Sequence, residues 1–404
     1  MDQSTVARSG PIRYATAERF RRPELVDPHD AGRPRDAICP QPPSRLDPVM
    51  GPPRDEHPQD EDCLHLAVAS PAFDDRARPV VVWLHGGGFS SGAGLLDWYD
   101  GGKLAAEGDV VVVGVNYRLG VLGYLRLPGI SDGNLGLFDQ LEALRWVRAN
   151  IARFGGDPDD VTVCGQSAGA LSALQLLAMP QGQGLLHRAV LQSAPLLSLR
   201  KTPEAAVALG QRFADALDDD PRTAEPAAIL AAQQAVGSAH AEQHGGLDLP
   251  FTPVSDVDIT EEPDTSFREN VRGLDVLYGW NLDDMSAFPD HGPDHAAVTE
   301  SLYGAPLRRF AEHLVETGAR VHSYRLDWRP QGSPFGATHC VELPLLFGTR
   351  DAWKDAPMLG NTPWSEVEEF GAALRRAWYT FARTGTPDTA DAQPWPVSWS
   401  VSDR

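Results

Sequence analysis

Ser167 stands in the middle of residues 165–169, Gly-Gln-Ser-Ala-Gly, a pattern in which a serine hydroxyl can act as a nucleophile. The β-branched run 161–164 before it predicts a strand, and the Ala- and Leu-rich run 168–179 after it predicts a helix. The serine therefore lies on a tight strand-to-helix turn, and the two glycines let the backbone turn without a Cβ clash. A serine held on such a turn can attack a carbonyl carbon. The pentapeptide alone leaves open a Gly/Ser turn without chemistry.

Acyl transfer by a serine also needs a base, a carboxylate that orients the base, and donors for the oxyanion. When the serine stands on such a turn of a parallel sheet, the acid and then the base follow it on loops after later strands. His339 lies in a loop after a predicted strand at 321–326 and is the candidate base. The loop after a predicted strand at 274–279 carries Asp283 and Asp284, and either of them fits the order.

Three consecutive glycines, residues 86–88, could supply backbone N–H groups to a substrate oxygen because no side chain blocks their approach. They follow the continuous apolar run 79–84, which is typical of a strand buried on both faces of a parallel sheet. The N–H group of Ala168, directly after the serine, would complete an oxyanion hole with Gly87 and Gly88. A flexible turn without this role is the alternative.

The elements around these loops indicate a doubly wound α/β fold, because a second buried strand at 110–115 and a helical pattern at 138–154 lie between the glycines and the serine. We expect one domain over 1–404, with a mostly parallel central sheet and helices on both faces. Residues 1–60 predict an extended N-terminal arm and residues 200–270 a reduced cap. Further predicted elements are strands at 64–68 and 190–193 and a closing helix at 366–383.

Composition excludes several classes of partner. The formal net charge is −21, and an acidic chain repels DNA, RNA and anionic membrane surfaces. No apolar run is long enough for a membrane span and no signal peptide is recognisable, so we expect a cytoplasmic protein. The cysteines lack C-x-x-C spacing and the histidines lack metal-ligand spacing, so no metal or other cofactor is expected.

Taken together, the motifs resemble those of the type-B carboxylesterases, the cholinesterase-like family of α/β hydrolases, and the chain looks like a shortened member. The likeness extends from about residue 15 to about residue 395. The matching stretches are 61–64, 85–89, 116–118, 134–140, 154–158, the serine turn and 336–348. The resemblance implies an α/β-hydrolase fold and an enzyme that hydrolyses small carboxylic esters through an acyl-enzyme intermediate.

The resemblance also implies roles for individual residues. Ser167 becomes the nucleophile, His339 the base and Asp284 the acid, with Asp283 as the alternative acid. The family acid is usually glutamate, which is one methylene longer, and the segment between the acid and the histidine is shorter here than is usual. The implied oxyanion donors are Gly87, Gly88 and Ala168.

Three further residues are implied to surround the triad, namely Gln166, Ser193 and Glu342. Gln166 replaces the usual glutamate of the serine turn, so near Glu342 an amide and a carboxylate would stand where the family has two carboxylates. Cys39 and Cys63 match a disulfide pair of the family, and without a secretion signal we expect them to be reduced.

The same machinery serves several reactions, so the sequence leaves alternatives to ester hydrolysis. Hydrolysis of a carbamate, lactone or amide, or acyl transfer to an alcohol, would use the same triad. A non-catalytic recognition domain of the same fold is a different class, which the presence of all three triad candidates in order opposes.

Overall fold

The computed structural model describes residues 6–26, 36–196, 200–255, 269–288, 294–387 and 397–401. These residues form a nine-stranded sheet in the order β1-β4-β6-β5-β9-β10-β11-β12-β13. The parallel strands at its centre are β6 (Val111–Val115), β5 (Arg78–Leu84), β9 (Gly156–Gln166), β10 (Arg188–Gln192), β11 (Asp275–Asn281) and β12 (Arg320–Leu326). Antiparallel strands β1 (Ala7–Arg13), β4 (His65–Ser70) and β13 (Val397–Val401) complete its two sides.

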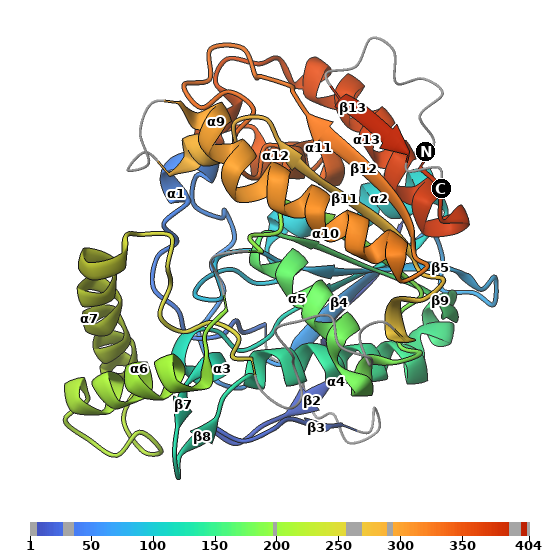
Figure 1. Cartoon of the computed structure of the whole chain (residues 1–404). Coiled ribbons are helices and arrows are strands. Elements are labelled where there is room, and N and C mark those ends of the chain that lie inside the picture. The colour runs from blue at the N-terminus through green and yellow to red at the C-terminus, as the bar shows by residue number, and fades with distance from the viewer. Residues whose placement is uncertain are drawn as a thin grey trace.

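The sheet separates two hydrophobic cores, because successive side chains of a strand point to opposite faces. In β5, Val80, Val82 and Leu84 belong to one core, whereas Val81 and Trp83 belong to the other. The first core is covered by α3 (Gly120–Tyr124), α4 (Leu135–Asn150), α5 (Ala168–Ala178) and α10 (Ala305–Glu316). The second is covered by α2 (Gly102–Gly108), α11 (Glu342–Phe347) and α13 (Trp364–Thr384). Figure 1 shows α4 and α5 on one side of the strands and α13 on the other.

The doubly wound α/β prediction is confirmed, with two differences at the sheet edges. The strand expected at 64–68 is β4, but β1 from the N-terminal segment lies outside it. Gly10 and Pro11 interrupt the strand pattern of β1 in the sequence. The strand forms nevertheless because it lies at an edge of the sheet, where one side of a strand needs no hydrogen bonds and proline is tolerated. At the other side β13 follows β12, although its residues 397–401 alternate in a strand-like way and could have been recognised.

Two helices occupy the region predicted as the cap, α6 (Pro203–Ala216) and α7 (Pro226–His244). They pack on each other, on α3 and on β7 (Arg126–Leu127), which pairs with β8 (Ser131–Asp132). Figure 1 shows them together, away from the parallel strands. Residues 256–268 of the predicted cap lie outside the described residues.

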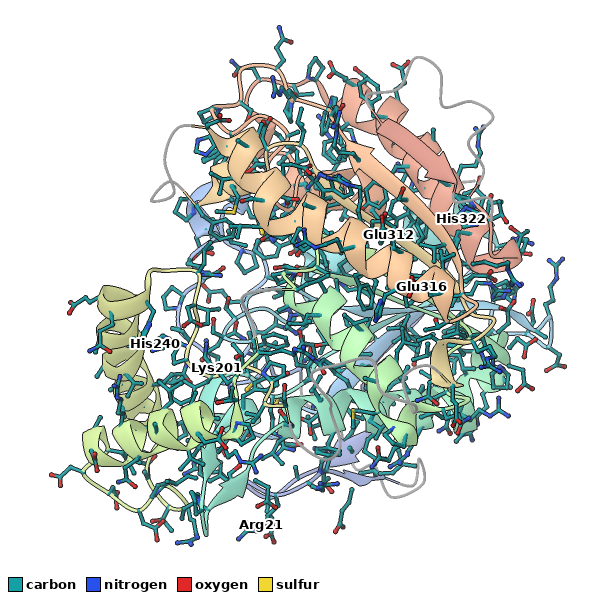
Figure 2. The ribbon with its side chains drawn as sticks, viewed as in Figure 1. Arg21, Lys201, His240, Glu312, Glu316 and His322 are labelled. Carbon is teal, nitrogen blue, oxygen red and sulfur yellow. The ribbon has the colours of Figure 1, made fainter. Side chains whose placement is uncertain are left out.

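A polar cluster ties the loop after α7 to the start of α6. The Asp248 carboxylate accepts a hydrogen bond from Nζ of Lys201, and its other oxygen lies 3.1 Å from Nε2 of His240. Figure 2 shows Lys201 and His240 close together on this side of the molecule. The cluster therefore fixes the chain that leads from α7 towards Leu249.

Two of the family-like motifs meet in a buried ion pair. The guanidinium of Arg118 donates to both oxygens of Asp139, at 2.8 and 2.6 Å, and the Arg118 backbone N–H also donates to this carboxylate. Such a pair fixes the loop before α3 against α4 because removing either partner would leave a buried charge unpaired. These motifs therefore serve the fold rather than the chemistry.

Two smaller observations bear on the expectations from sequence. Cys39 and Cys63 are buried free thiols, and Cys39 Sγ accepts the backbone N–H of Leu119. Among the described helices none is long and apolar enough to cross a membrane.

Candidate active site

Ser167 lies between β9 and α5 with the unusual backbone angles φ 54° and ψ −121°. Its backbone N–H donates to the carbonyl oxygen of Gln192 at 2.8 Å, which ties the turn to β10. A Cβ on Gly165 would lie 2.3 Å from the Gly169 carbonyl carbon, and a Cβ on Gly169 would lie 2.0 Å from the Leu84 oxygen. Both glycines are therefore required for the close packing that holds the serine in its strained conformation.

The structure brings Asp284 and His339 into direct contact. Nδ1 of His339 lies 2.7 Å from Oδ1 of Asp284, and both side chains are fully buried. The other carboxylate oxygen accepts hydrogen bonds from Ser193 Oγ and from the backbone N–H of Asn281, each at 2.9 Å. The Asp284 carboxylate is thus fixed, and it in turn fixes the orientation of the imidazole ring.

Asp283, the alternative acid, faces a different partner. Its carboxylate accepts two hydrogen bonds from Arg329, at 2.8 and 3.0 Å, and one from the backbone N–H of Ala337 at 3.0 Å. These bonds hold the loop that carries His339 against the end of β11. The carboxylate that contacts the histidine is therefore that of Asp284.

Gln166 contacts His339 at the atom that a general base would use. Its amide nitrogen lies 3.1 Å from Nε2 of the ring. Because Nδ1–H donates to Asp284, Nε2 of the neutral ring is an acceptor, and the amide of Gln166 donates to it. Among the described residues no hydrogen bond joins the Ser167 hydroxyl to His339, so the Gln166 amide must move aside before the serine can use this nitrogen.

Asn281 is a site residue that the sequence analysis did not identify. Its side-chain amide donates to the Thr338 carbonyl oxygen at 2.9 Å and to Oε2 of Glu342, and its backbone N–H supports Asp284. The amide that hydrogen-bonds to Glu342 is therefore that of Asn281, whereas Gln166 hydrogen-bonds to His339. Its place three residues before Asp284 was visible in the sequence, but its long-range partners were not.

Glu342 is buried beside this network, and one of its carboxylate oxygens has no hydrogen-bond partner among the described residues. Burial, and secondarily the charge of Asp284, raises the pKa of Glu342 from its ordinary 4.5 to about 7, against smaller opposing effects of Asn281 and His339. The side chain therefore keeps its proton in the folded protein at a pH at which an exposed glutamate has lost it.

A raised pKa makes the folded state bind more protons than the unfolded state between pH 4.5 and about 7. The stability that Glu342 contributes is therefore complete below pH 4.5 and is lost as the pH rises through about 7. Glu342→Gln should abolish this loss. Between acid and mildly alkaline pH, the unfolding free energy of the wild type should fall by on the order of 3 kcal/mol more than that of the variant.

Urea unfolding of the wild type and Glu342→Gln at a series of pH values measures the difference. Glu312→Gln is the matched control, because Glu312 is exposed on α10 and is labelled in Figure 2. Parallel pH profiles for the wild type and Glu342→Gln would show that Glu342 titrates normally.

The glycine loop lies directly beside the serine. A Cβ on Gly86 would be 3.3 Å from Cβ of Ser167. Gly87 and Gly88 have positive φ angles of 109° and 63°, and within the described part of the chain the N–H groups of Gly87, Gly88 and Ala168 have no acceptor. N–H groups without an acceptor, close to a candidate nucleophile, are what an oxyanion hole requires.

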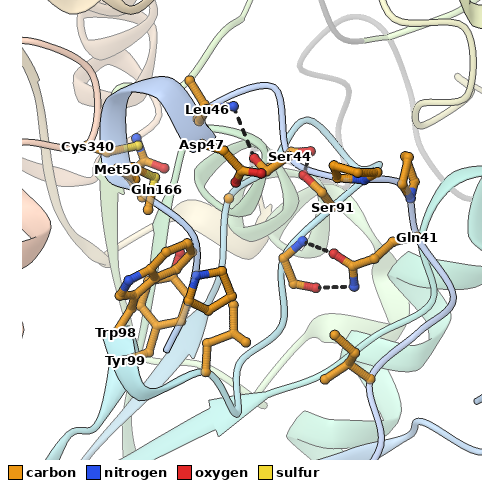
Figure 3. Close-up of a pocket in the computed structure, with 18 of the residues that line it drawn as sticks. Gln41, Ser44, Leu46, Asp47, Met50, Ser91, Trp98, Tyr99, Gln166 and Cys340 are labelled. Atoms are coloured by element: carbon orange, nitrogen blue, oxygen red, sulfur yellow. Dashed lines mark hydrogen bonds between the residues drawn. The ribbon is translucent and has the colours of Figure 1, made fainter. Parts of the chain in front are cut away.

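Buried side chains hold this loop from behind. Nδ1 of His85 lies 2.7 Å from the Gly86 carbonyl oxygen, and its ring stacks on Tyr117 at 4.3 Å. Burial lowers the pKa of His85 to about 4, against a smaller effect of its bond to Gly86, so the ring is neutral and Nδ1 donates. The Gln41 amide bonds both the N–H and the carbonyl of Gly92, as the dashed lines in Figure 3 show.

A cavity of about 240 Å³ lies between this loop and the segment that leads into α1 (Asp47–Met50). Figure 3 shows its wall, which includes Trp98, Tyr99 and, at one end, Gln166 and Cys340. The cavity offers the Gln166 side chain room to turn away from His339.

Gly87→Ala should lower turnover by roughly 10²-fold or more, because one oxyanion donor is typically worth about 3 kcal/mol. The new Cβ would lie 2.0 Å from the Ser91 carbonyl oxygen, so the loop must shift and carry its N–H group away. Steady-state ester hydrolysis and a thermal melt measure the effect. Gly129→Ala is the control, since Gly129 also has positive φ, 79°, but open space around it. Near-normal turnover of a folded Gly87→Ala would place the oxyanion donors elsewhere.

The described residues contain no group of three or more metal-ligating side chains. The structure does bring a buried aspartate and histidine together beside the strained serine turn. This arrangement can carry out nucleophilic acyl transfer.

Comparison with known proteins finds similarity to esterases and hydrolases. A model of the carboxylesterase family matches residues 5–296 and 294–403. The probable N-octanoylanthranilate hydrolase AqdA2 of Rhodococcus erythropolis is 40% identical over 402 residues, covering 93% of this chain and 88% of that protein. The para-nitrobenzyl esterase of Bacillus subtilis is 36% identical, covering 89% and 81%. Among solved structures, a PNB esterase superposes with a TM-score of 0.85 at 30% identity, covering 100% of this chain and 95% of that one.

Proposed function

The chain belongs to the carboxylesterase family and is a carboxylic ester hydrolase, and we propose that it acts as a serine esterase through an acyl-enzyme intermediate. The observation that carries this proposal is the buried contact between Asp284 and His339 beside the strained turn of Ser167. A non-catalytic recognition domain, the alternative of a different class, does not fit relatives that are named as esterases and hydrolases.

In the proposed reaction Ser167 Oγ attacks the ester carbonyl carbon while Nε2 of His339 takes the hydroxyl proton. The carbonyl oxygen becomes an oxyanion and accepts hydrogen bonds from Gly87, Gly88 and Ala168. Collapse of the tetrahedral intermediate breaks the bond to the alcohol, which leaves with the proton from His339.

Water then repeats the sequence on the acyl-enzyme and releases the carboxylic acid and the free serine. Asp284 stays ionised throughout, holds the ring in the required tautomer and stabilises the imidazolium. The Gln166 amide has to leave Nε2 before the first step, since one nitrogen lone pair cannot accept from both the amide and the serine hydroxyl.

Hydrolysis of an N-acyl anthranilate amide is the second candidate, because a relative with 40% identity is named for an N-octanoylanthranilate. The same nucleophile and base would serve, but the leaving amine must receive its proton from His339 as the bond breaks.

Hydrolysis of matched 4-nitrophenyl esters and 4-nitroanilides of the same acids tests the proposal. We expect ester turnover at saturation, with a burst of 4-nitrophenol equal to the enzyme concentration where deacylation is slow. A purified, folded protein that hydrolyses no ester of the panel would refute it, and faster cleavage of anilides would favour the second candidate.

A further inference from the structure

Arg45 lies beside the candidate active site although it belongs to the N-terminal segment. Its Nη2 is 3.4 Å from the position that a Cβ on Gly88 would occupy, so the guanidinium is next to the oxyanion loop. Its Cζ also lies 5.2 Å from the centre of the Phe288 ring. The Phe288 ring is in turn 5.5 Å from the ring of His339. Arg45 therefore reaches both sides of the place where a substrate would bind.

The guanidinium has no carboxylate partner among the described residues, in a chain whose net charge is −21. Within the described part of the chain its one hydrogen bond runs from Nη1 to the Gly246 carbonyl oxygen at 2.6 Å. A guanidinium has five N–H donors, so this bond anchors the group and leaves other donors for a ligand.

Apolar side chains lie between the exposed Arg45 and His339. The residue is exposed to solvent, yet desolvation by surrounding protein lowers the pKa of its guanidinium, with a smaller opposing effect of Tyr303. The Tyr303 ring lies 5.8 Å from that of His339, and Leu249 contacts the same face of Gly88. Aromatic and aliphatic side chains thus lie next to an exposed guanidinium on the side of the candidate active site.

We propose that Arg45 determines substrate specificity by binding a carboxylate group of the substrate, so that the enzyme prefers anionic esters with an apolar body. This inference rests on the proposed esterase function and names its substrate class. The guanidinium matches a carboxylate in shape and charge and can donate two parallel hydrogen bonds to it. The apolar neighbours would bind the remainder of such a substrate.

The overall negative charge of the protein does not oppose this preference at short range. At physiological ionic strength salt screens exposed charges beyond roughly 8 Å. A carboxylate within hydrogen-bonding distance of Arg45 therefore experiences chiefly the guanidinium.

The test compares kcat/KM for matched ester pairs in which one member carries a carboxylate and the other a carboxamide in its place. One set has the group on the acyl side, as 4-nitrophenyl hemiesters of succinate, glutarate and adipate, and another has it on the alcohol side, as butyryl esters of hydroxybenzoates. For the wild type we expect the carboxylate member to be preferred in at least one set. The optimal chain length would report the distance from Ser167 to Arg45.

Arg45→Met keeps much of the side-chain length but removes the charge. We expect it to lower the ratio of carboxylate to carboxamide kcat/KM by about tenfold to a hundredfold, the usual effect of losing a charge-assisted hydrogen bond. The loss should fall mainly on KM, and Arg45→Lys should retain part of the ratio because it keeps the charge. Arg54→Met is the matched control, since Arg54 is exposed and faces Asp351 at the surface.

The outcomes separate this inference from the proposed function. A wild type that hydrolyses esters without favouring the carboxylate in any set would overturn the role of Arg45. So would an unchanged ratio in Arg45→Met, which would leave Arg45 as an anchor of Gly246 only. If Arg45→Met does not fold, two measurements still test the role of Arg45: the preference of the wild type for the carboxylate member, and the ratio of carboxylate to carboxamide kcat/KM in Arg45→Lys. A wild type without any ester hydrolysis would instead refute the esterase proposal.

Discussion

Ser167→Ala should leave the protein folded and lower ester turnover by several orders of magnitude, roughly 10⁴-fold to 10⁶-fold. The substitution removes only the hydroxyl group. Ser167 Oγ has no hydrogen-bond partner among the described residues, so the substitution breaks no hydrogen bond of theirs. The backbone bond from Ser167 N–H to Gln192 remains. Turnover at saturating ester and a thermal melt measure the two parts of this expectation.

Ser172→Ala is the matched control for this variant. Ser172 lies on the same helix α5, is fully buried, and accepts a hydrogen bond from the Gln140 amide at 3.1 Å. Removing the Ser172 hydroxyl should lower stability more than turnover. A folded Ser167→Ala that kept most of its activity would show that another residue attacks the ester.

Asp284→Asn should lower turnover near neutral pH by up to roughly 10⁴-fold, because the amide removes the charge and can favour the wrong imidazole tautomer. The substitution keeps the shape of the side chain, so an oxygen can still accept from Ser193 or Asn281. The loss should appear in kcat as well as in kcat/KM, since the carboxylate stabilises an imidazolium that exists only during the reaction.

Asp283→Asn gives the sharpest comparison, because the two aspartates are neighbours in the chain. Asp283 binds Arg329 and the Ala337 N–H, so its variant should lose stability while most turnover remains at a temperature where it is folded. The reverse order of turnover in the two variants would assign the acid to Asp283. Normal turnover in both would place the acid outside this loop.

Much of the fold and the core of the site could be predicted from the sequence because local patterns carry them. The apolar strands β5 and β6 and the glycine-flanked turn of Ser167 are local patterns, and the strand-to-helix turn lies where it was expected. The order of serine, acid and histidine then limited the candidates to one histidine and two neighbouring aspartates. The residues alone left Asp283 and Asp284 open, and the family resemblance favoured Asp284. In the structure the carboxylate that contacts His339 is that of Asp284.

Other features depend on contacts between segments that are far apart in the chain, and no local pattern reports these. The Gln166 amide hydrogen-bonds to His339, whereas the amide that hydrogen-bonds to Glu342 comes from Asn281, a residue more than a hundred positions away in the chain. Arg45 reaches the glycine loop of residues 86–88 only because the N-terminal segment passes beside Gly88. Edge strand β1 was hidden by its glycine and proline, whose effect on a strand depends on whether it lies at an edge.

Labelling with a fluorophosphonate, which reacts with an activated serine hydroxyl, tests the central claim most directly. We expect one label per chain, on the peptide that contains Ser167, with ester hydrolysis falling in proportion to labelling. Asp284→Asn should react far more slowly, because it loses the carboxylate that orients His339. Ser172→Ala should react at the wild-type rate, because the Ser172 hydroxyl bonds to Gln140 and not to His339. A label on another serine, or full hydrolysis after complete labelling, would contradict the assignment of Ser167 as the nucleophile.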